Sequence, residues 1–287
     1  EATPISLTLQ GGQVAIHADK SRFKLATMPV SEFPAVDMDK SAGHQFDISD
    51  SALFALIQRT HFAMAQQDVH YFLNGKLLSY DGTSTLHAVA TDGHRLATNS
   101  TSVESATQAP WQVIVPRKTI AELMRLVTPD DNTLHVQLTE HHICFTGTRF
   151  TLTSKLIDGK FPDYRQVIPK DCDKVVRIDR DVLKNCLIRA SILSSEKHRS
   201  VVFTMQDNEM KIIANNPDQE EATESLSIDW AHPPLEIAFN VNYILNILSS
   251  VALGDVEIHF KGADNSVLIT EADETVNALY VIMPMRI

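Results

Sequence analysis

The chain has 287 residues, of which 44% are hydrophobic and 21% are charged, and its formal net charge is −11. This composition is that of a soluble globular protein with substantial cores, and it excludes a disordered or collagen-like chain. The negative charge argues against a protein that grips nucleic acid by wrapping it in a basic surface, because such affinity depends on neutralising phosphates.

The N-terminal residues predict a small antiparallel sheet. Residues 5–9 and 13–18 alternate apolar and polar side chains around a Gly-Gly pair, which favours a hairpin, and residues 22–27 alternate again as a strand. The pattern then changes to the spacing of an amphipathic helix, with Ser49 or Asp50 as its N-cap.

The rest of the chain runs twice through one order of elements. Strands are predicted at 71–73, 77–80, 86–91 and 95–100, followed by a helix at 117–126 and alternating segments from 133 to 157. A helix at 179–192, strands at 201–205 and 210–214, a helix at 242–251 and closing strands then follow. Each part offers two helices and roughly eight short strands joined by turns, so we predict an α+β fold with antiparallel sheets.

An internal repeat supports this division. Apolar residues match apolar residues and the two arginines coincide when Phe46, Ile48, Leu53, Ile57, Arg59 and Phe62 are aligned with Val176, Ile178, Leu183, Leu187, Arg189 and Ile192. The second helices match likewise, with Val115, Ile120, Leu123 and Met124 over Phe239, Ile244, Ile247 and Leu248. A copy of roughly 120 residues has the size of a domain and is too long for a solenoid unit.

A third, partial match covers only the end of a repeat. It aligns Leu7, Leu9, Val14, Ile16, Phe23, Leu25, Phe33 and Pro34 with Val136, Leu138, Ile143, Phe145, Phe150, Leu152, Phe161 and Pro162. We therefore predict a domain remnant at 1–43 and two domains at 44–171 and 172–287. Because the first copy lacks its opening elements and Glu1 is not an initiator methionine, we expect the chain to be the remainder of a longer three-domain protein.

Enzyme and cofactor signatures are sparse. The chain has no phosphate-binding loop, dinucleotide-binding glycine motif, zinc-protease motif or nucleophile elbow. His141 and His142 are adjacent on a predicted strand and point to opposite faces, so scattered surface histidines are favoured over a metal site, and no cofactor is indicated. Cys144, Cys172 and Cys186 form no C-x-x-C pair, and no segment has the pattern of a membrane span or signal peptide, which favours a cytoplasmic protein.

Three local features remain open to two interpretations. The segment Ala90 to Ala97 places Asp92-Gly93 between two strands, as a hairpin turn or as part of a catalytic Asp–His arrangement. The apolar tail from Tyr280 is either a docked strand or an adaptable surface for peptides. Opposed charge clusters suggest head-to-tail contact or two solvated faces. The clusters are Lys20, Arg22 and Lys24, and Asp218, Glu220, Glu221 and Glu224.

Motifs along nearly the whole chain resemble one family, the beta subunit of bacterial DNA polymerase III, the replication sliding clamp, in its gamma-proteobacterial type. The resemblance rests on Phe62-Ala63-Met64-Ala65, Asp68, Tyr71, Leu73-Asn74-Gly75, Ala90 to Ala97, Ile114 to Lys118, Thr153 to Leu156, Phe161 to Arg165, Asn215-Asn216-Pro217, Phe239-Asn240-Val241 and Met283 to Arg286. It implies a non-catalytic processivity factor for DNA replication. Three similar domains per subunit would form a head-to-tail homodimer ring, with helices lining the hole and sheets outside.

The resemblance also implies three sets of site residues. DNA-facing residues would be Arg59, Gln66, Gln67, His70, Tyr71, Phe72, Arg117, Lys118, Arg125, Lys184 and Arg189. The partner-peptide pocket would comprise Leu73, Thr91, Gly93, His94, Arg95, Leu96, Pro162, Val167, His198, Asn240, Tyr243, Ser266, Val281, Ile282, Met283, Pro284, Met285 and Arg286. The ring interface would comprise Lys20, Arg22, Phe23, Leu25, Ile192, Leu193, Asp218, Glu220, Glu221 and Glu224.

The implied partners are double-stranded DNA, held without sequence specificity, and polymerase subunits, the clamp loader and repair proteins. The proteins would bind through short motifs rich in Gln, Leu and Phe. Gln166 stands where the family often has arginine and His198 where it often has phenylalanine, so we expect a pocket rim that is less cationic and less apolar. Because most of the first domain is missing, three copies of the two complete domains are an alternative to the two-subunit ring. The competing function classes are an enzyme using Asp92 and His94 and a purely structural oligomer.

Overall fold

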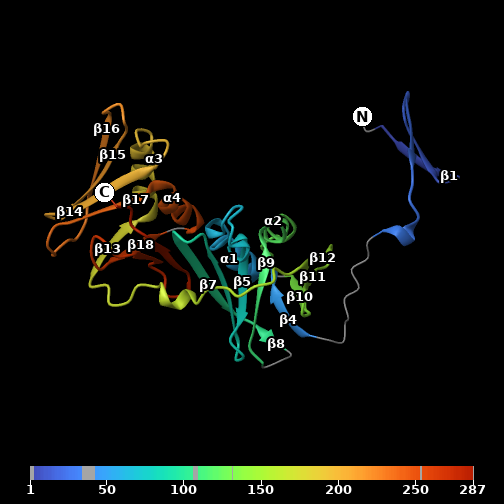
Figure 1. Cartoon of the computed structure of the whole chain (residues 1–287), viewed down its shortest axis with the longest axis horizontal. Coiled ribbons are helices and arrows are strands. Elements are labelled where there is room, and N and C mark those ends of the chain that lie inside the picture. The colour runs from blue at the N-terminus through green and yellow to red at the C-terminus, as the bar shows by residue number, and fades with distance from the viewer. Residues whose placement is uncertain (1–2, 34–42, 106–108, 131, 253, 287) are drawn as a thin grey trace. The chain divides into compact units, whose positions relative to one another are not determined.

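Local sequence signals mark the starts of helices in the described part of the chain. The side chain of Ser49 accepts a hydrogen bond from the Ala52 N–H at the start of α1. The side chain of Asp179 accepts one from the Val182 N–H at the start of α3. Pro116 precedes α2, where its fixed backbone suits a helix entry. The helices are α1 (Asp50–Gln58), α2 (Arg117–Leu126), α3 (Arg180–Ser191) and α4 (Val241–Ser250). They pair two by two, α1 with α2 and α3 with α4 (Figure 1).

The computed structural model describes residues 3–33, 43–105, 109–130, 132–252 and 254–286. The chain divides into two units, residues 1–39 and 40–287. The first unit is a three-stranded sheet in which β2 (Gln13–Ala18) lies between β1 (Ile5–Gln10) and β3 (Ser21–Ala26), as the alternation predicts. Pro34 of the repeat comparison lies outside the described residues.

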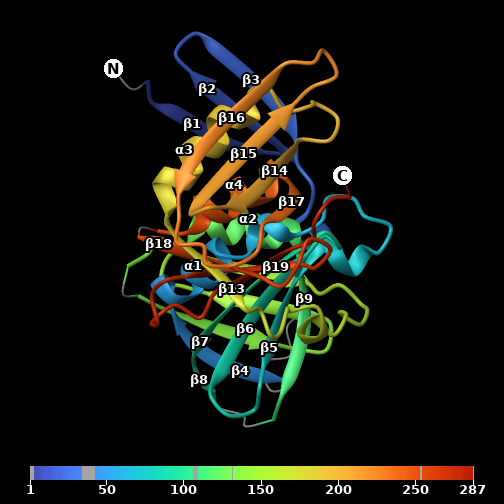
Figure 2. The ribbon, with the colours of Figure 1, turned by 90° about the vertical axis from the view of Figure 1, so that its left-hand side faces the viewer.

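The described residues of the second unit form three sheets. The five-stranded sheet has the order β12 (Thr151–Lys155), β11 (His142–Thr146), β10 (Thr133–Leu138), β4 (His44–Ser49) and β8 (Glu104–Ser105). The four-stranded sheet has the order β16 (Glu221–Ser227), β15 (Glu209–Asn215), β14 (Ser200–Gln206) and β17 (Leu235–Asn240). Helix α3 contacts β15 and β16 of the latter (Figure 2).

The third sheet has eight strands and draws on both predicted domains. Its order is β13 (Lys174–Asp179), β18 (Asp255–Phe260), β19 (Val267–Glu271), β20 (Leu279–Ile282), β7 (Arg95–Ser102), β6 (Thr85–Thr91), β5 (Gly75–Tyr80) and β9 (Trp111–Pro116). All strand pairings among the described residues are antiparallel, so the predicted α+β class is confirmed. No helix in the described part of the chain is long and apolar enough to cross a bilayer.

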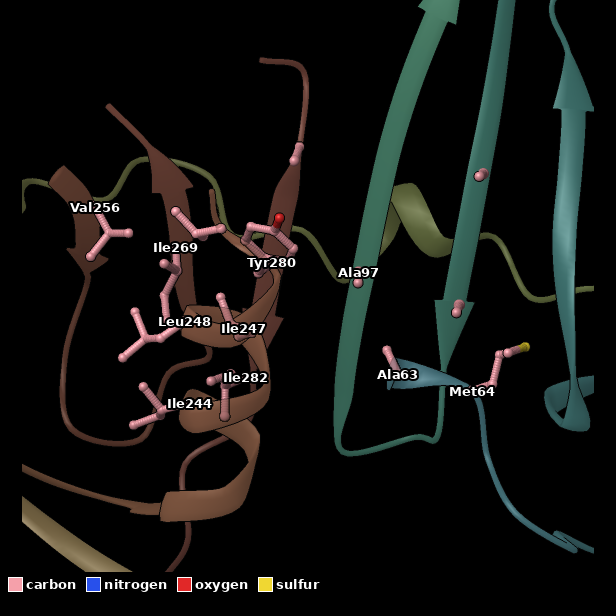
Figure 3. Close-up of a cluster of buried hydrophobic side chains, with 14 of the residues drawn as sticks. Ala63, Met64, Ala97, Ile244, Ile247, Leu248, Val256, Ile269, Tyr280 and Ile282 are labelled. Atoms are coloured by element: carbon pink, nitrogen blue, oxygen red, sulfur yellow. The ribbon is translucent and has the colours of Figure 1, made fainter. Parts of the chain in front are cut away.

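The strands β20 and β7 join the two predicted domains, and the apolar core continues across this junction. Tyr280 lies opposite Ala97 and is completely buried. Figure 3 shows Ile244, Ile247 and Leu248 of α4 packed beside β20, with Ala63 and Met64 near β7. The two predicted domains therefore share a sheet and a core.

The prediction of a strand at 71–73 is wrong. Residues Tyr71–Asn74 form a 3-10 helix, and β5 begins only at Gly75. The side chain of Asn74 accepts a hydrogen bond from the Asp68 N–H at 2.8 Å and donates one to the Asp68 carbonyl at 2.9 Å. These two bonds close a loop over residues 68–74, which overrides the strand preference of its aromatic residues.

A fully buried lysine completes the end of helix α1. Lys76 on β5 has no exposed surface, and its Nζ donates to the Ile57 carbonyl at 3.1 Å. Carbonyl groups in the last turn of a helix lack i+4 partners, and the Ile57 carbonyl accepts from the Thr60 N–H as well as from Lys76. Burial lowers the pKa of Lys76 well below its ordinary value of 10.5.

This burial makes stability depend on pH. Between the lowered folded pKa and about 10.5, the unfolded chain binds one more proton at Lys76 than the folded chain. The free energy of unfolding should therefore rise with pH relative to a Lys76→Met variant, by about 1.4 kcal/mol per pH unit. Urea unfolding of both proteins at several pH values measures this difference. Parallel curves would show that Lys76 keeps its proton in the folded state.

Candidate functional site

A tight turn positions the first side chains of the site. Gly93 has a φ of +86°, the left-handed conformation that glycine adopts readily. The Asp92 carboxylate accepts hydrogen bonds from the backbone N–H groups of His94 and Arg95, and the Thr91 hydroxyl donates to the Arg95 carbonyl. The predicted Asp-Gly hairpin turn between β6 and β7 is therefore confirmed.

Arg95 ties this turn to the other domain. Its guanidinium donates to the Asp92 carboxylate at 2.9 Å, the Asn246 side chain at 2.8 Å and the Phe62 carbonyl at 2.8 Å. It also lies over the Tyr243 ring, 4.5 Å from its centre. Asn246 and Tyr243 belong to α4, so one side chain links β7, α4 and the segment after α1. Asp92 and His94 thus have structural partners.

An apolar pocket of about 180 Å³ opens beside the turn. Leu96 and Val281 form part of its wall from the paired strands β7 and β20. The segment Phe161–Val167 forms another part, and Leu73 contributes from the 3-10 helix. Beneath it Leu77, Ile114 and Tyr164 belong to a small core of their own. We call this cavity the apolar pocket.

Most residues predicted for peptide binding meet here. Those that line the apolar pocket are Leu73, Thr91, Gly93, His94, Arg95, Leu96, Pro162, Val167, Ser266, Val281 and Met283. Pro284, Met285 and Arg286 line an adjoining groove together with Ser266 and Met283. The tail is held there because the Met285 N–H donates to the Ala238 carbonyl at 2.8 Å.

Seven predicted residues do not line the apolar pocket: Pro284, Met285 and Arg286 line the adjoining groove, and four others line neither cavity. Ile282 is buried in the core, Asn240 caps α4, and Tyr243 stacks on His94 and Arg95 from outside. His198 is exposed in the segment after α3. Phe161, Asp163 and Tyr164 line the pocket but are absent from the predicted set. All three residues lie in the turn-rich segment 160–165, and the predicted set contains only Pro162 from that segment.

The predicted DNA-facing residues divide into an exposed loop and a set of helix cations. Gln66, Gln67, His70 and Tyr71 are exposed on the loop that precedes β5. Phe72 on the same loop is half-buried and packs against the small core beneath the apolar pocket. Asp68 holds this loop by accepting a hydrogen bond from the His70 N–H at 2.7 Å. Hydrogen bonds from the His70 backbone and side chain lower the pKa of Asp68.

The helix cations differ in how far they are already paired. Arg59 at the end of α1 forms an ion pair with Glu271 of β19 at 2.9 Å, and Glu271 is nearly buried. Arg189 on α3 makes two hydrogen bonds to Glu224 of β16, at 2.8 and 2.5 Å. Arg117 on α2 donates to the Met64 carbonyl at 2.9 Å. Arg125 on α2 forms a longer ion pair with Glu122, at 3.5 Å. No ion pair with the described residues involves Lys118 or Lys184.

The predicted ring-interface residues lie at or next to two edge strands and at the end of α3. In the first unit, Phe23 and Leu25 on β3 are 56% and 51% exposed, and Arg22 lies beside them on the same strand. In the second unit, β16 forms an edge of its sheet and carries Glu221 and Glu224, with Asp218 and Glu220 in the preceding turn. Ile192, at the end of α3, is 74% exposed, and Lys20 and Leu193 complete the set.

Comparison with known proteins gives concordant matches along the chain. A family model for the DNA polymerase III beta subunit, central domain, matches residues 47–163, and one for its C-terminal domain matches residues 165–286. The chain is 45% identical to the beta sliding clamp of Pseudomonas aeruginosa over 99% of its own length and 76% of the relative's. It is 42% identical to the Escherichia coli beta sliding clamp over 100% of this chain and 77% of the relative. A crystal structure of the Pseudomonas aeruginosa clamp bound to griselimycin superposes with a TM-score of 0.91 at 45% identity, covering 99% of this chain and 76% of that one.

The three-way contact of Arg95 gives a prediction about the junction. Lysine carries the same charge but lacks the planar fork, so Arg95→Lys should lose at least two of the three hydrogen bonds. We expect the free energy of unfolding to fall by about 2 kcal/mol, measured by urea unfolding. Arg165→Lys is the matched control, because Arg165 is exposed and lies over Tyr164 only. Equal effects of both changes would contradict the role given to Arg95.

Proposed function

Because the chain belongs to the family of the DNA polymerase III beta subunit, the beta sliding clamp, we propose that it encircles duplex DNA and recruits replication proteins through the apolar pocket. The resemblance drawn from the sequence is confirmed by this membership. The chain is a non-catalytic processivity factor of DNA replication. The observation that carries the recruitment proposal is the apolar pocket at the junction of β7 and β20.

The apolar pocket suits the anchor of a short linear motif. Leu96, Val281 and Met283 offer apolar contacts, while the exposed backbone and hydroxyl groups of the turn stand at the edge. An apolar cleft with a few polar groups is typical of a site that buries one or two large side chains. We propose that Leu and Phe residues of polymerase subunits, the clamp loader and repair proteins enter here, with a Gln residue nearby.

A peptide-binding measurement tests this site. His94→Ala should weaken binding of a synthetic Gln-, Leu- and Phe-containing peptide by about tenfold, because His94 lines the pocket. Fluorescence anisotropy with the labelled peptide measures the change. His141→Ala is the matched control, since this histidine is exposed and outside the pocket. Equal binding of the peptide to both variants would refute the apolar pocket as the peptide site. Turnover of a substrate that depended on His94 would instead favour an enzyme that uses Asp92 and His94.

The DNA contact is proposed to come from the exposed loop and from the helix cations that hold no close carboxylate. Lys118, Arg125 and Lys184 retain charge that can meet phosphates, whereas Arg59 and Arg189 already hold carboxylates. A ring needs only weak phosphate contacts, because topology keeps the DNA inside. This reconciles DNA binding with a net charge of −11.

Ring closure is proposed to use the two charged sheet edges. The chain already contains one joint of the same kind, in which the closing strand β20 of one domain pairs with β7 of the preceding domain. By the internal repeat, β3 corresponds to β12, which like β20 is the last strand of its domain. In the order of elements, β16 is the third strand after α3, as β7 is the third strand after α1. Cations on β3 and carboxylates at β16 favour this pairing between copies.

We also propose domain limits of 44–171 and 172–287, with 1–43 as the end of a further clamp domain. The internal repeat and the two strand-helix orders support these limits. A cytoplasmic location is proposed as well. It fits a protein of DNA replication whose three cysteines are free.

Encirclement has a topological signature. Protein assembled on nicked circular duplex DNA should stay bound during gel filtration in about 0.3 M salt and be lost once the circle is cut, because screening removes simple electrostatic binding. Light scattering of the assembled protein counts the copies per ring, which separates two-subunit from three-copy assemblies. Loss at the same rate from circular and linear DNA would favour a structural oligomer without a DNA role.

A further inference from the structure

Two open grooves with different linings adjoin the apolar pocket. The first, of about 760 Å³, is lined by residues 236–238, 263–264, 266 and 283–286. The second, of about 590 Å³, is lined by residues 166–171, Lys261, Asn265, Ser266 and Met283. Ser266 and Met283 border the pocket and both grooves, so the three form one continuous surface. A peptide anchored in the pocket must therefore run into one or both grooves.

The two grooves carry opposite charge. The first has the carboxylates of Glu236 and Asp264 against Arg286, and we call it the acidic groove. The second has Lys170 and Lys261 against Asp171, and we call it the basic groove. A positively charged groove is notable on a chain with a net charge of −11.

The lysines of the basic groove are available for a ligand. Neither Lys170 nor Lys261 forms an ion pair with any described residue. The nearby carboxylate of Asp173 is already occupied by Lys174, whose Nζ lies 2.6 Å from it and also donates to the Lys261 carbonyl. Among the carboxylates that line the groove, only Asp171 remains to oppose the two cations.

Gln166 connects the basic groove to the apolar pocket. Its amide donates to Asp163 at 2.9 Å, and Asp163 itself lines the pocket. This bond turns the Gln166 side chain toward the pocket rim, and Gln166 adds no charge to the groove. The two lysines are thus the groove's only cationic groups among the described residues.

We propose that the basic groove binds an acidic side chain, Asp or Glu, that flanks the apolar anchor of a partner's linear peptide. The acidic groove repels the same side chain, so the flanking charge selects the direction in which the peptide lies across Met283. The inference rests on the proposed function of the apolar pocket. It adds a charge rule, namely that an acidic residue beside the apolar anchor binds the basic groove and sets the direction of the peptide.

The expected effect is modest and depends on salt. Exposed ion pairs of this kind change affinity by about two- to fivefold each, and screening reduces the change at high ionic strength. Two lysines acting on two carboxylates should therefore give a preference of about five- to tenfold at low salt.

A peptide series with one common apolar core tests the proposal on the full chain. The core is flanked by two Asp, two Ser or two Lys residues, at either its N-terminal or its C-terminal end, and affinity is measured by fluorescence anisotropy at about 0.05 and 0.3 M salt. On the wild-type protein, Asp at one end should bind about five- to tenfold more tightly than Ser, and Asp at the other end should not. The double variant Lys170→Gln, Lys261→Gln should abolish that preference while binding the Ser peptide normally.

The control variant Lys155→Gln, Lys197→Gln removes two exposed lysines outside all three cavities and should keep the preference. The charge reversal Lys170→Glu, Lys261→Glu should instead favour the Lys-flanked peptide. Equal binding of Asp and Ser peptides to the wild type, or a preference that survives in the Gln variant, overturns the charge rule. A Ser peptide that fails to bind, or ignores His94→Ala, overturns the proposed function of the pocket instead.

Discussion

The pairing of β20 with β7 is the contact on which the rest of the molecule depends. Four cross-strand pairs, from Leu279 with Thr98 to Ile282 with Arg95, join the sheets of two domains into one. A shift by one residue would move Tyr280 to the opposite face of the sheet, away from the core that buries it completely. The register is therefore held by packing as well as by backbone hydrogen bonds.

Polar contacts secure the same junction at two places. Arg59 reaches Glu271 across it, and Glu271 also accepts a hydrogen bond from the Tyr280 hydroxyl at 3.2 Å. Burial raises the pKa of Tyr280, which keeps this hydroxyl protonated as a donor. Arg95 makes the second set of contacts to α4. Together these contacts hold β7, β20 and α4 in place beside the apolar pocket.

The repeated arginines show why position in a repeat does not settle a residue's role. Arg59 and Arg189 occupy matching places at the ends of α1 and α3, yet one holds a carboxylate in the next domain and the other holds Glu224 in its own. Both charges are partly neutralised within the fold. The proposed DNA contact therefore relies on other helix cations, of which Lys118 and Lys184 form no ion pair with the described residues.

Much of the fold follows from the sequence because its signals are local. Helix α2 coincides with the predicted 117–126, since Pro116 and the apolar spacing act within one or two turns, and the Asp92-Gly93 turn follows from adjacent residues. The loop that replaces the strand predicted at 71–73 depends on the bond between Asp68 and Asn74, which periodicity does not reveal. Phe161 and Tyr164 likewise line the pocket only because their segment lies against the shared sheet.

The sequence by itself determined the α+β class, the repeated order of elements, the family and most of the residues that meet at the pocket. Only the tertiary structure decided which cations are neutralised, which side chains leave the pocket lining, and how two grooves of opposite charge meet at Met283. The reason is distance along the chain: Arg59 and Glu271 are 212 positions apart, and no local pattern reports a partner so remote.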